Sequence, residues 1–195
     1  MKILNFINIL TSLIGYDQSS APVQPTPRKV TSIKQPVKNV AISDRAMCVL
    51  VENGDVICFY NNSYTKLTFN HFKSDSNLTK LRTPSILNIK ASSNTFAALS
   101  SLGEVFIFAS PNEITKQIKP QKVWSFRNHF TSIRDFDVGS NGAIIICTNS
   151  GTVYVKMSKN NSDSMPSTWK DSKKSSKFVR IPLHRVSNVF ACDSG

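Results

Sequence analysis

The chain has 195 residues, 40% of them hydrophobic, which suffices for one domain or for part of a larger one. This hydrophobic content, which includes 12 Phe, excludes a wholly disordered protein. The 24 Lys and Arg residues outnumber the 12 Asp and Glu residues, and the net charge of +12 suits an acidic partner such as nucleic acid, chromatin or anionic lipid.

Residues 1–15, MKILNFINILTSLIG, predict an amphipathic helix that docks on a partner or on the domain itself. The apolar residues recur with the spacing of one helix face. They are Ile3, Phe6, Ile7, Leu10, Leu13 and Ile14. A signal peptide is an alternative because one Lys precedes the apolar run, and a membrane-surface anchor is another. No segment is long enough to span a bilayer.

Residues 16–36 have the composition of an extended linker, with four Pro residues among Ser and Gln. From Val37 onward the sequence changes to short β-branched and aromatic runs separated by Gly, Asn, Ser and Asp. No helical period is sustained there. This pattern is typical of an all-β region built from hairpins.

One hairpin sequence recurs at a nearly constant spacing. VENGDVICFY, SLGEVFIFAS and NSGTVYVKMS align, with Gly54 over Gly103 at an offset of 49 residues and Gly151 another 48 residues on. The final stretch, VSNVFACDSG, repeats the opening VKNVAISD of the first unit. The alignment predicts a repeat region over 37–195, with units 37–85, 86–132 and 133–185 and an incomplete unit 186–195.

Each unit predicts three strands joined by a polar turn and a glycine turn. In the first unit these strands contain NVAI, MCVLV and VICFY, and KLTF at Lys66–Phe69 is a candidate for a further edge strand. Gly54, Gly103 and Gly151 are expected at positive φ in tight turns. A period near 50 with three or four strands is typical of a propeller blade. The predicted core comprises Val40, Val49, Leu50, Val56, Phe59, Ile89, Phe96, Leu99, Val105, Phe108, Phe136, Ile145 and Val153.

The phrases VLVENGDVI, ALSSLGEVF and ICTNSGTVY resemble the regulator of chromosome condensation (RCC) repeat family. In that family an apolar pair and a short turn precede Gly, any residue, Val and an aromatic residue. The likeness covers Val37–Gly195, but Ser43, Asp44 and Ala46 stand where the family has a glycine pair and a histidine. The resemblance implies an all-β, partial β-propeller of about three blades plus the start of a fourth.

The last units resemble more closely the propeller of the inhibitor of Bruton tyrosine kinase and its fungal BTB-domain relatives. The likeness lies in TSIRDFDVGSNGAIIICTNSGTVYVKM, the insertion KDSKKSSKF and VRIPLHRVSNVFACDSG. It implies a protein-interaction module of a substrate adaptor that reaches a cullin-type ubiquitin ligase through a domain absent from this chain. The rival expectation is an RCC-like propeller that promotes nucleotide exchange on a small GTPase or docks on chromatin. Both place the protein in the cytoplasm or nucleus.

A secreted module is a third alternative, prompted by the signal-like start and by N-glycosylation sequons at Asn61, Asn77 and Asn160. The last residue, Gly195, falls where the next turn would begin. We therefore expect either a longer protein or a partner to complete the ring.

No catalytic, cofactor or metal-binding motif appears, so neither an enzyme nor a cofactor is expected. His71, His129 and His184 lie in separate predicted loops without a companion nucleophile. The four cysteines lack zinc-ligand spacing. Cys48 and Cys58 flank the Asn53-Gly54 turn almost symmetrically, and we expect them to approach each other across the hairpin as buried thiols.

Residues 156–185 form a basic, serine-rich stretch. We consider it a candidate docking loop for an acidic protein or nucleic-acid surface, with a charge that phosphorylation would reduce. The alternative is a solvated insertion between two blades. Its candidate contact residues are Lys170, Lys173, Lys174, Lys177 and Arg180.

Overall fold

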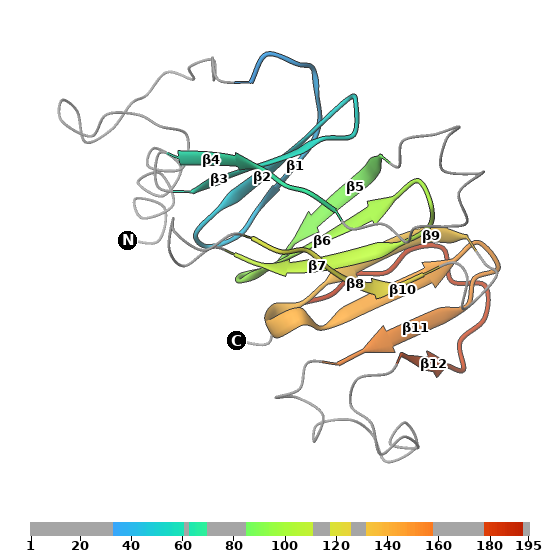
Figure 1. The fold of residues 1–195 in the computed structure, drawn as a ribbon. Coiled ribbons are helices and arrows are strands. Elements are labelled where there is room, and N and C mark those ends of the chain that lie inside the picture. The colour runs from blue at the N-terminus through green and yellow to red at the C-terminus, as the bar shows by residue number, and fades with distance from the viewer. Residues whose placement is uncertain are drawn as a thin grey trace, which may run out of the picture.

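The computed structural model describes residues 33–60, 63–69, 85–110, 118–125, 132–157 and 178–192. Its strands form three four-stranded antiparallel sheets placed one after another along the chain (Figure 1). The prediction of an all-β partial propeller is confirmed, whereas the helix predicted over 1–15 lies outside the described residues. Within the described part, no helix is long and apolar enough to cross a membrane.

Each sheet is one blade, and its strands follow each other in sequence order. Blade 1 contains β1 (Val37–Ile42), β2 (Met47–Val51), β3 (Val56–Tyr60) and β4 (Ser63–Lys66). Blade 2 contains β5 (Ile86–Ala91), β6 (Thr95–Ser100), β7 (Val105–Ala109) and β8 (Gln121–Trp124). Blade 3 contains β9 (Ile133–Val138), the 3-10 turn η2 (Ser140–Gly142), β10 (Ile144–Thr148), β11 (Val153–Lys156) and β12 (Val179–Ile181).

Every described blade has a fourth strand, and two of these strands differ from the prediction. β4 begins at Ser63, so the predicted edge strand Lys66–Phe69 was placed three residues too late. β12 pairs with β11 inside the stretch 156–185 that was expected to be a loop. Both strands are short and neither contains a continuous apolar run: β4 is exposed at every position, and in β12 the exposed Arg180 separates the half-buried Val179 from the buried Ile181. Pairing with the preceding strand decides where they form.

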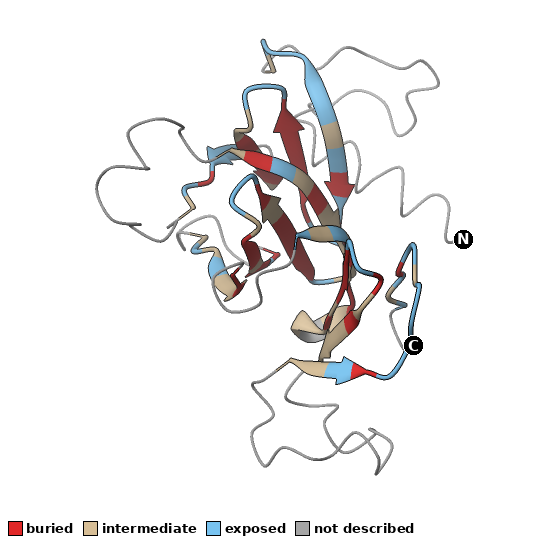
Figure 2. Ribbon diagram, turned by 90° about the vertical axis from the view of Figure 1, so that its right-hand side faces the viewer, coloured by how far each residue is buried: buried red, intermediate tan, exposed pale blue. Residues whose placement is uncertain are grey.

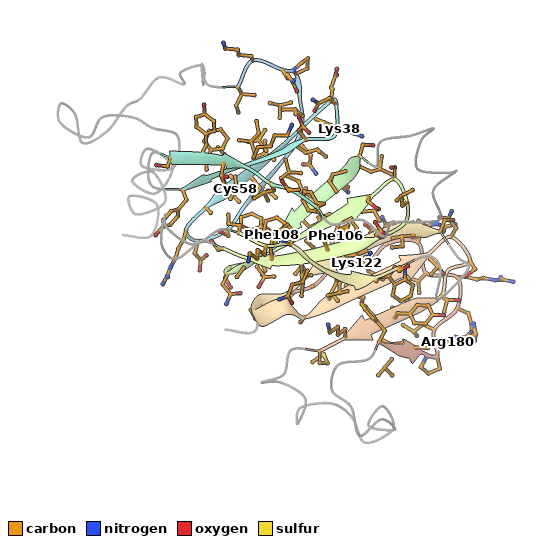
Figure 3. All side chains as sticks on the ribbon, in the orientation of Figure 1. Lys38, Cys58, Phe106, Phe108, Lys122 and Arg180 are labelled. Carbon is orange, nitrogen blue, oxygen red and sulfur yellow. The ribbon has the colours of Figure 1, made fainter. Side chains whose placement is uncertain are left out.

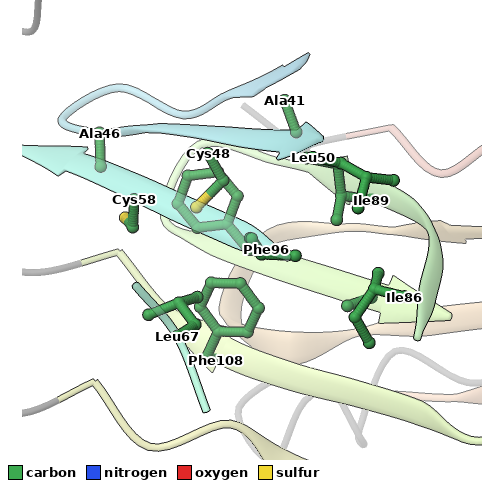
Figure 4. Packing of buried hydrophobic residues seen from close by; sticks show 12 residues of the cluster. Ala41, Ala46, Cys48, Leu50, Cys58, Leu67, Ile86, Ile89, Phe96 and Phe108 are labelled. Carbon is green, nitrogen blue, oxygen red and sulfur yellow. The ribbon is translucent and has the colours of Figure 1, made fainter. Parts of the chain in front are cut away.

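The hydrophobic core lies between blades. The central strand β2 is buried along its whole length, and alternate residues point to opposite faces of the sheet. Its Cys48 and Leu50 pack against Ile89, Phe96 and Phe108 of blade 2 (Figure 4). A second core joins blades 2 and 3, and Figure 2 shows that burial is concentrated on the central strands. Each blade therefore depends on its neighbour for burial.

Most of the predicted core is confirmed, with one error. Val40 is 45% exposed because it faces away from blade 2, on the side where no described blade packs. Leu99 and Ile145 are half-buried. The other predicted core residues are buried: Val49, Leu50, Val56, Phe59, Ile89, Phe96, Val105, Phe108, Phe136 and Val153.

Candidate protein-interaction surface

A polar side chain at the third position of the first and second units links their innermost strands. Asn39 Nδ2 in β1 donates to Asn88 Oδ1 at 2.5 Å and to the Ile89 carbonyl at 3.1 Å in β5. Asn88 Oδ1 also accepts from the Ile89 amide of its own strand at 2.9 Å. The Asn88 side chain thus bonds both to its own strand and to Asn39 of the adjacent blade. These bonds fix the position of β5 relative to β1.

Two carboxylates of β9 extend this linkage to residues 186–192. Asp135 Oδ2 accepts from the Val189 amide at 3.0 Å and from Asn188 Nδ2 at 3.5 Å. Asp137 Oδ2 accepts from the Ala191 amide at 2.9 Å. Residues 186–192 form no strand ladder, so these carboxylates replace the missing backbone pairing. The start of the fourth unit is thereby fixed against blade 3.

The turns that follow the innermost strands form a continuous row, here called the turn row, at residues 43–45, 92–94 and 139–142. Ser43 Oγ lies 3.0 Å from Ser110 Oγ, and the Asp44 amide donates to the Ser93 carbonyl at 2.9 Å. Ser92 Oγ donates to the Gly139 carbonyl at 3.0 Å. These bonds between blades make the turn row one connected surface, with the side chains of Asp44 and Arg45 exposed on it.

The basic insertion leaves blade 3 on the same side as the turn row. Lys156, the last residue of β11, pairs in register with Ile144, which Ala143 alone separates from η2. The chain returns at Phe178 into β12. The insertion therefore lies within blade 3, between its third and fourth strands, and the expectation of an insertion between two blades is wrong.

Of the candidate contact residues, only Arg180 is described. It is exposed in the middle of β12, opposite Tyr154, so it belongs to an edge strand and not to a loop. Figure 3 shows it at the opposite end of the row of blades from Lys38. The other four lysines, Lys170, Lys173, Lys174 and Lys177, lie outside the described residues.

An aromatic cluster anchors the returning end of the insertion. The ring of Trp124 in β8 lies 5.0 Å from the ring of Tyr154 and 4.9 Å from that of Phe178, both edge-on. Trp124 is buried between blades 2 and 3. Aromatic pairs of this geometry contribute about 0.5–1.5 kcal/mol beyond the area that they bury. The insertion thus ends on a rigid part of the core.

The turn glycines have a second role that the sequence pattern did not indicate. Gly54, Gly103 and Gly151 have φ values of +86°, +68° and +76°. A Cβ on Gly54 would overlap the Cβ of Ser85, and one on Gly151 would lie 2.9 Å from the Arg185 Cα. Ser85 and Arg185 belong to the segments that enter the next unit. These two glycines therefore allow the chain to pass closely from blade to blade.

Comparison with known proteins supports this architecture. No protein-family model matches the chain. The chain is 29% identical over 190 residues to BTB/POZ domain-containing protein 1 of Schizosaccharomyces pombe, covering 89% of this chain and 14% of that protein. Prp20p from Saccharomyces cerevisiae aligns with a TM-score of 0.55 at 14% identity, covering 80% of this chain and 40% of Prp20p. Yeast RCC1 (Prp20) bound to Kap60 gives a TM-score of 0.54 at 15% identity over 80% of this chain and 39% of that chain.

The chain has the fold of an RCC1-type propeller. The resemblance to RCC-like repeats and to a fungal BTB-domain protein is therefore confirmed. Because the chain spans about one seventh of the BTB/POZ relative, it corresponds to a small part of that protein.

Several ionisable groups of this RCC1-type propeller are buried and contact one another inside a blade. Cys48 and Cys58 are buried register partners, as expected from their spacing, and they are free thiols. Burial, together with the Cys58 thiol, raises the pKa of Cys48 well above its usual value. The Lys122 ammonium lies 3.0 Å from Glu104 Oε1, at a carboxylate that is almost fully buried.

In the described parts of the propeller, no group of three or more His, Cys, Asp or Glu residues could hold a metal ion. His184 is exposed, and the other two histidines of the sequence lie outside the described residues. The described polar groups of the turn row form hydrogen bonds between blades and leave Asp44 and Arg45 exposed.

Proposed function

We propose that this RCC1-type propeller segment is a non-catalytic protein-recognition module of a substrate adaptor for a cullin-type ubiquitin ligase. The observation that supports this proposal is the 29% identity to a BTB/POZ domain protein over nearly the whole chain. The contact with the ligase would lie in a BTB domain elsewhere in the protein. The propeller would select the substrate.

The turn row and the insertion of blade 3 are the proposed recognition surface. Loops on a rigid scaffold commonly carry binding residues. Hydrogen bonds between blades fix the turn row, and the contact of Phe178 with Trp124 fixes one end of the insertion. Residues 158–177 contain five lysines and two aspartates, so the preferred partner is an acidic segment of a protein.

The test is affinity purification of the endogenous full-length protein with mass spectrometry. We expect a cullin to co-purify with it, together with acidic client proteins. Replacing four of the five lysines of the insertion by Ser should deplete the clients and leave the cullin bound. The replaced lysines are Lys170, Lys173, Lys174 and Lys177, and the matched control replaces Lys34, Lys38, Lys90 and Lys119. Absence of any cullin from the purified complex would refute the adaptor role.

Action on a small GTPase or on chromatin is the second candidate. Prp20p, whose structure was described together with its binding to Gsp1p and histones, shares the fold, and the net charge of +12 suits histone-bound DNA. Release of labelled GDP from small GTPases and pull-down with nucleosomes test this candidate. Accelerated release, or nucleosome capture that survives 0.2 M salt, would favour it over the adaptor role.

A further inference from the structure

The outermost strand of each described blade carries a cation at the same register position. These cations are Lys66 in β4, Lys122 in β8 and Arg180 in β12. Each is the register partner of the residue three positions after the turn glycine of its blade. Three outermost strands with otherwise different sequences thus share this feature.

In blades 1 and 2 the cation pairs with a carboxylate of the same blade. The Lys66 ammonium lies 2.6 Å from Asp55 Oδ2, and the Lys122 ammonium lies 3.0 Å from Glu104 Oε1. Both acidic residues directly follow the turn glycine, two positions before the register partner of the cation. This spacing puts the carboxylate and the cation on one face of the sheet, as diagonal neighbours on adjacent strands. A carboxylate therefore fits beside the cation of the outermost strand.

Blade 3 has the cation but lacks the carboxylate. Thr152 follows the turn glycine in the place of the acidic residue. The two carboxylates that the structure describes in blade 3, those of Asp135 and Asp137, accept hydrogen bonds from the fourth unit. No described carboxylate pairs with Arg180, which is exposed in β12 (Figure 3). Its guanidinium is open to a carboxylate from another molecule.

Blade 3 also keeps a hydrogen-bond donor for an anion at this position. In blade 1, Asn53 Nδ2 donates to Asp55 Oδ2 at 2.9 Å. Ser150 is the equivalent of Asn53, and its Oγ lies 3.2 Å from Thr152 Oγ1. Ser150 is exposed, and a hydroxyl group can rotate to donate to an incoming oxygen. Blade 3 thus has the cation and the donor but not the acceptor.

We propose that Arg180 and Ser150 bind a side-chain carboxylate of an acidic partner segment, where Asp55 and Glu104 lie in their own blades. Arg suits an external partner better than Lys does, because its planar guanidinium can bind both oxygens of a carboxylate. Arg180 lies two residues after Phe178, where the basic insertion returns, so the site continues the recognition surface. The site rests on the proposed function for the acidic character of its partner.

Binding of a fluorescein-labelled octaglutamate peptide to the full-length protein tests the site by fluorescence anisotropy. Arg180→Gln should weaken binding about three- to fivefold, the upper range for an exposed ion pair. Arg180→Lys keeps the cation found in the other blades and should retain most of the affinity. Lys38→Gln removes an exposed charge from blade 1 and should leave the affinity nearly unchanged. Equal losses from Arg180→Gln and Lys38→Gln would show attraction by the net charge alone and would overturn the proposal.

A carboxylate supplied by the chain itself provides the second test. Thr152→Asp places it where Asp55 lies in blade 1, so it should pair with Arg180 and weaken peptide binding as much as Arg180→Gln does. Thr152→Asn is the neutral control of similar shape and should bind the peptide like the unchanged protein. In the double variant the effects of Thr152→Asp and Arg180→Gln should not add. Full additivity would show that the two positions do not form one site.

The outcome for this site is separable from the outcome for the adaptor role. If a cullin co-purifies while Arg180→Gln binds the peptide normally, the site is refuted and the adaptor role stands. If peptide binding depends on Arg180 and no cullin co-purifies, the site stands and the adaptor role is refuted. A phosphate on Thr152 of the endogenous protein, detected by mass spectrometry, would also overturn the proposal, because the chain would then supply its own anion.

Discussion

Replacing Gly54 with Ala tests the close passage from blade 1 to blade 2. Gly54 has φ +86°, a conformation that costs an L-residue about 1–2 kcal/mol. The new Cβ would also overlap the Ser85 Cβ, and it would lie 3.0 Å from the Ser85 Cα and 3.1 Å from the Ile86 nitrogen. Overpacking of this kind costs about 1–3 kcal/mol. We therefore expect the free energy of unfolding to fall by about 2–5 kcal/mol.

Gly142 provides a matched control. Its φ is +80°, close to that of Gly54, but a Cβ there would only reach the Ile107 Cδ1, at an ordinary contact distance of 3.5 Å. Gly142→Ala should therefore bear the backbone cost alone, about 1–2 kcal/mol. Equilibrium urea unfolding followed by circular dichroism measures both variants, and the difference between them isolates the packing between blades.

A third variant checks the cause of that difference. Ser85→Gly removes one of the overlapping atoms, so it should recover part of the stability lost in Gly54→Ala and none of that lost in Gly142→Ala. If Gly54→Ala and Gly142→Ala unfold at the same urea concentration with the same slope, the close approach of Ser85 contributes nothing. The reasoning from backbone proximity would then be refuted.

Three further predictions concern ionisable and polar groups. Lys66 lowers the pKa of Asp55 by a hydrogen bond, so this pair stabilises the fold fully above about pH 4 and progressively less as the pH falls through the folded pKa. An NMR titration of Lys66→Met should move the Asp55 pKa up to its ordinary range, with a stability change of only a few tenths of a kcal/mol. Iodoacetamide at neutral pH should modify the exposed Cys192 and spare Cys48, whose buried thiol has a raised pKa; equal rates by mass spectrometry would contradict the described burial. Asp135→Ala should cost about 1–3 kcal/mol and speed amide hydrogen exchange in residues 186–192, while unchanged exchange there would show that the carboxylate does not hold the fourth unit.

The strands and turns within each hairpin could be predicted from the sequence, because the repeat units align with one another. Apolar runs such as MCVLV specify central strands because these strands are buried on both faces. The recurring glycine places Gly54, Gly103 and Gly151 at equivalent turns, and all three have positive φ. The spacing of Cys48 and Cys58 about one of these turns predicts their pairing across the hairpin. These features depend on contacts within one hairpin.

The candidate interaction surface could be predicted only in part. The charge of the insertion is visible in the sequence, but its position inside blade 3 depends on β12, a three-residue strand that exists through its pairing with β11. The hydrogen bonds of Asn39 and Asp135 to the following unit involve residues about 50 positions apart, and no local pattern specifies such partners. The polar residue repeated at the third position of each unit is the sequence signal that could have indicated them.

The three inner strands of each blade, their glycine turns and the period at which they recur can be predicted from the amino-acid sequence, because each follows from local periodicity and glycine stereochemistry. Tertiary structure decided the environment of each blade face. Val40 and Ile89 occupy the same position in their units, yet Val40 is exposed and Ile89 is buried, because among the described blades one packs in front of Ile89 and none packs in front of Val40. Whether a residue on a blade face is buried depends on the neighbouring blade. The sequence of one repeat unit does not specify which neighbour that unit has.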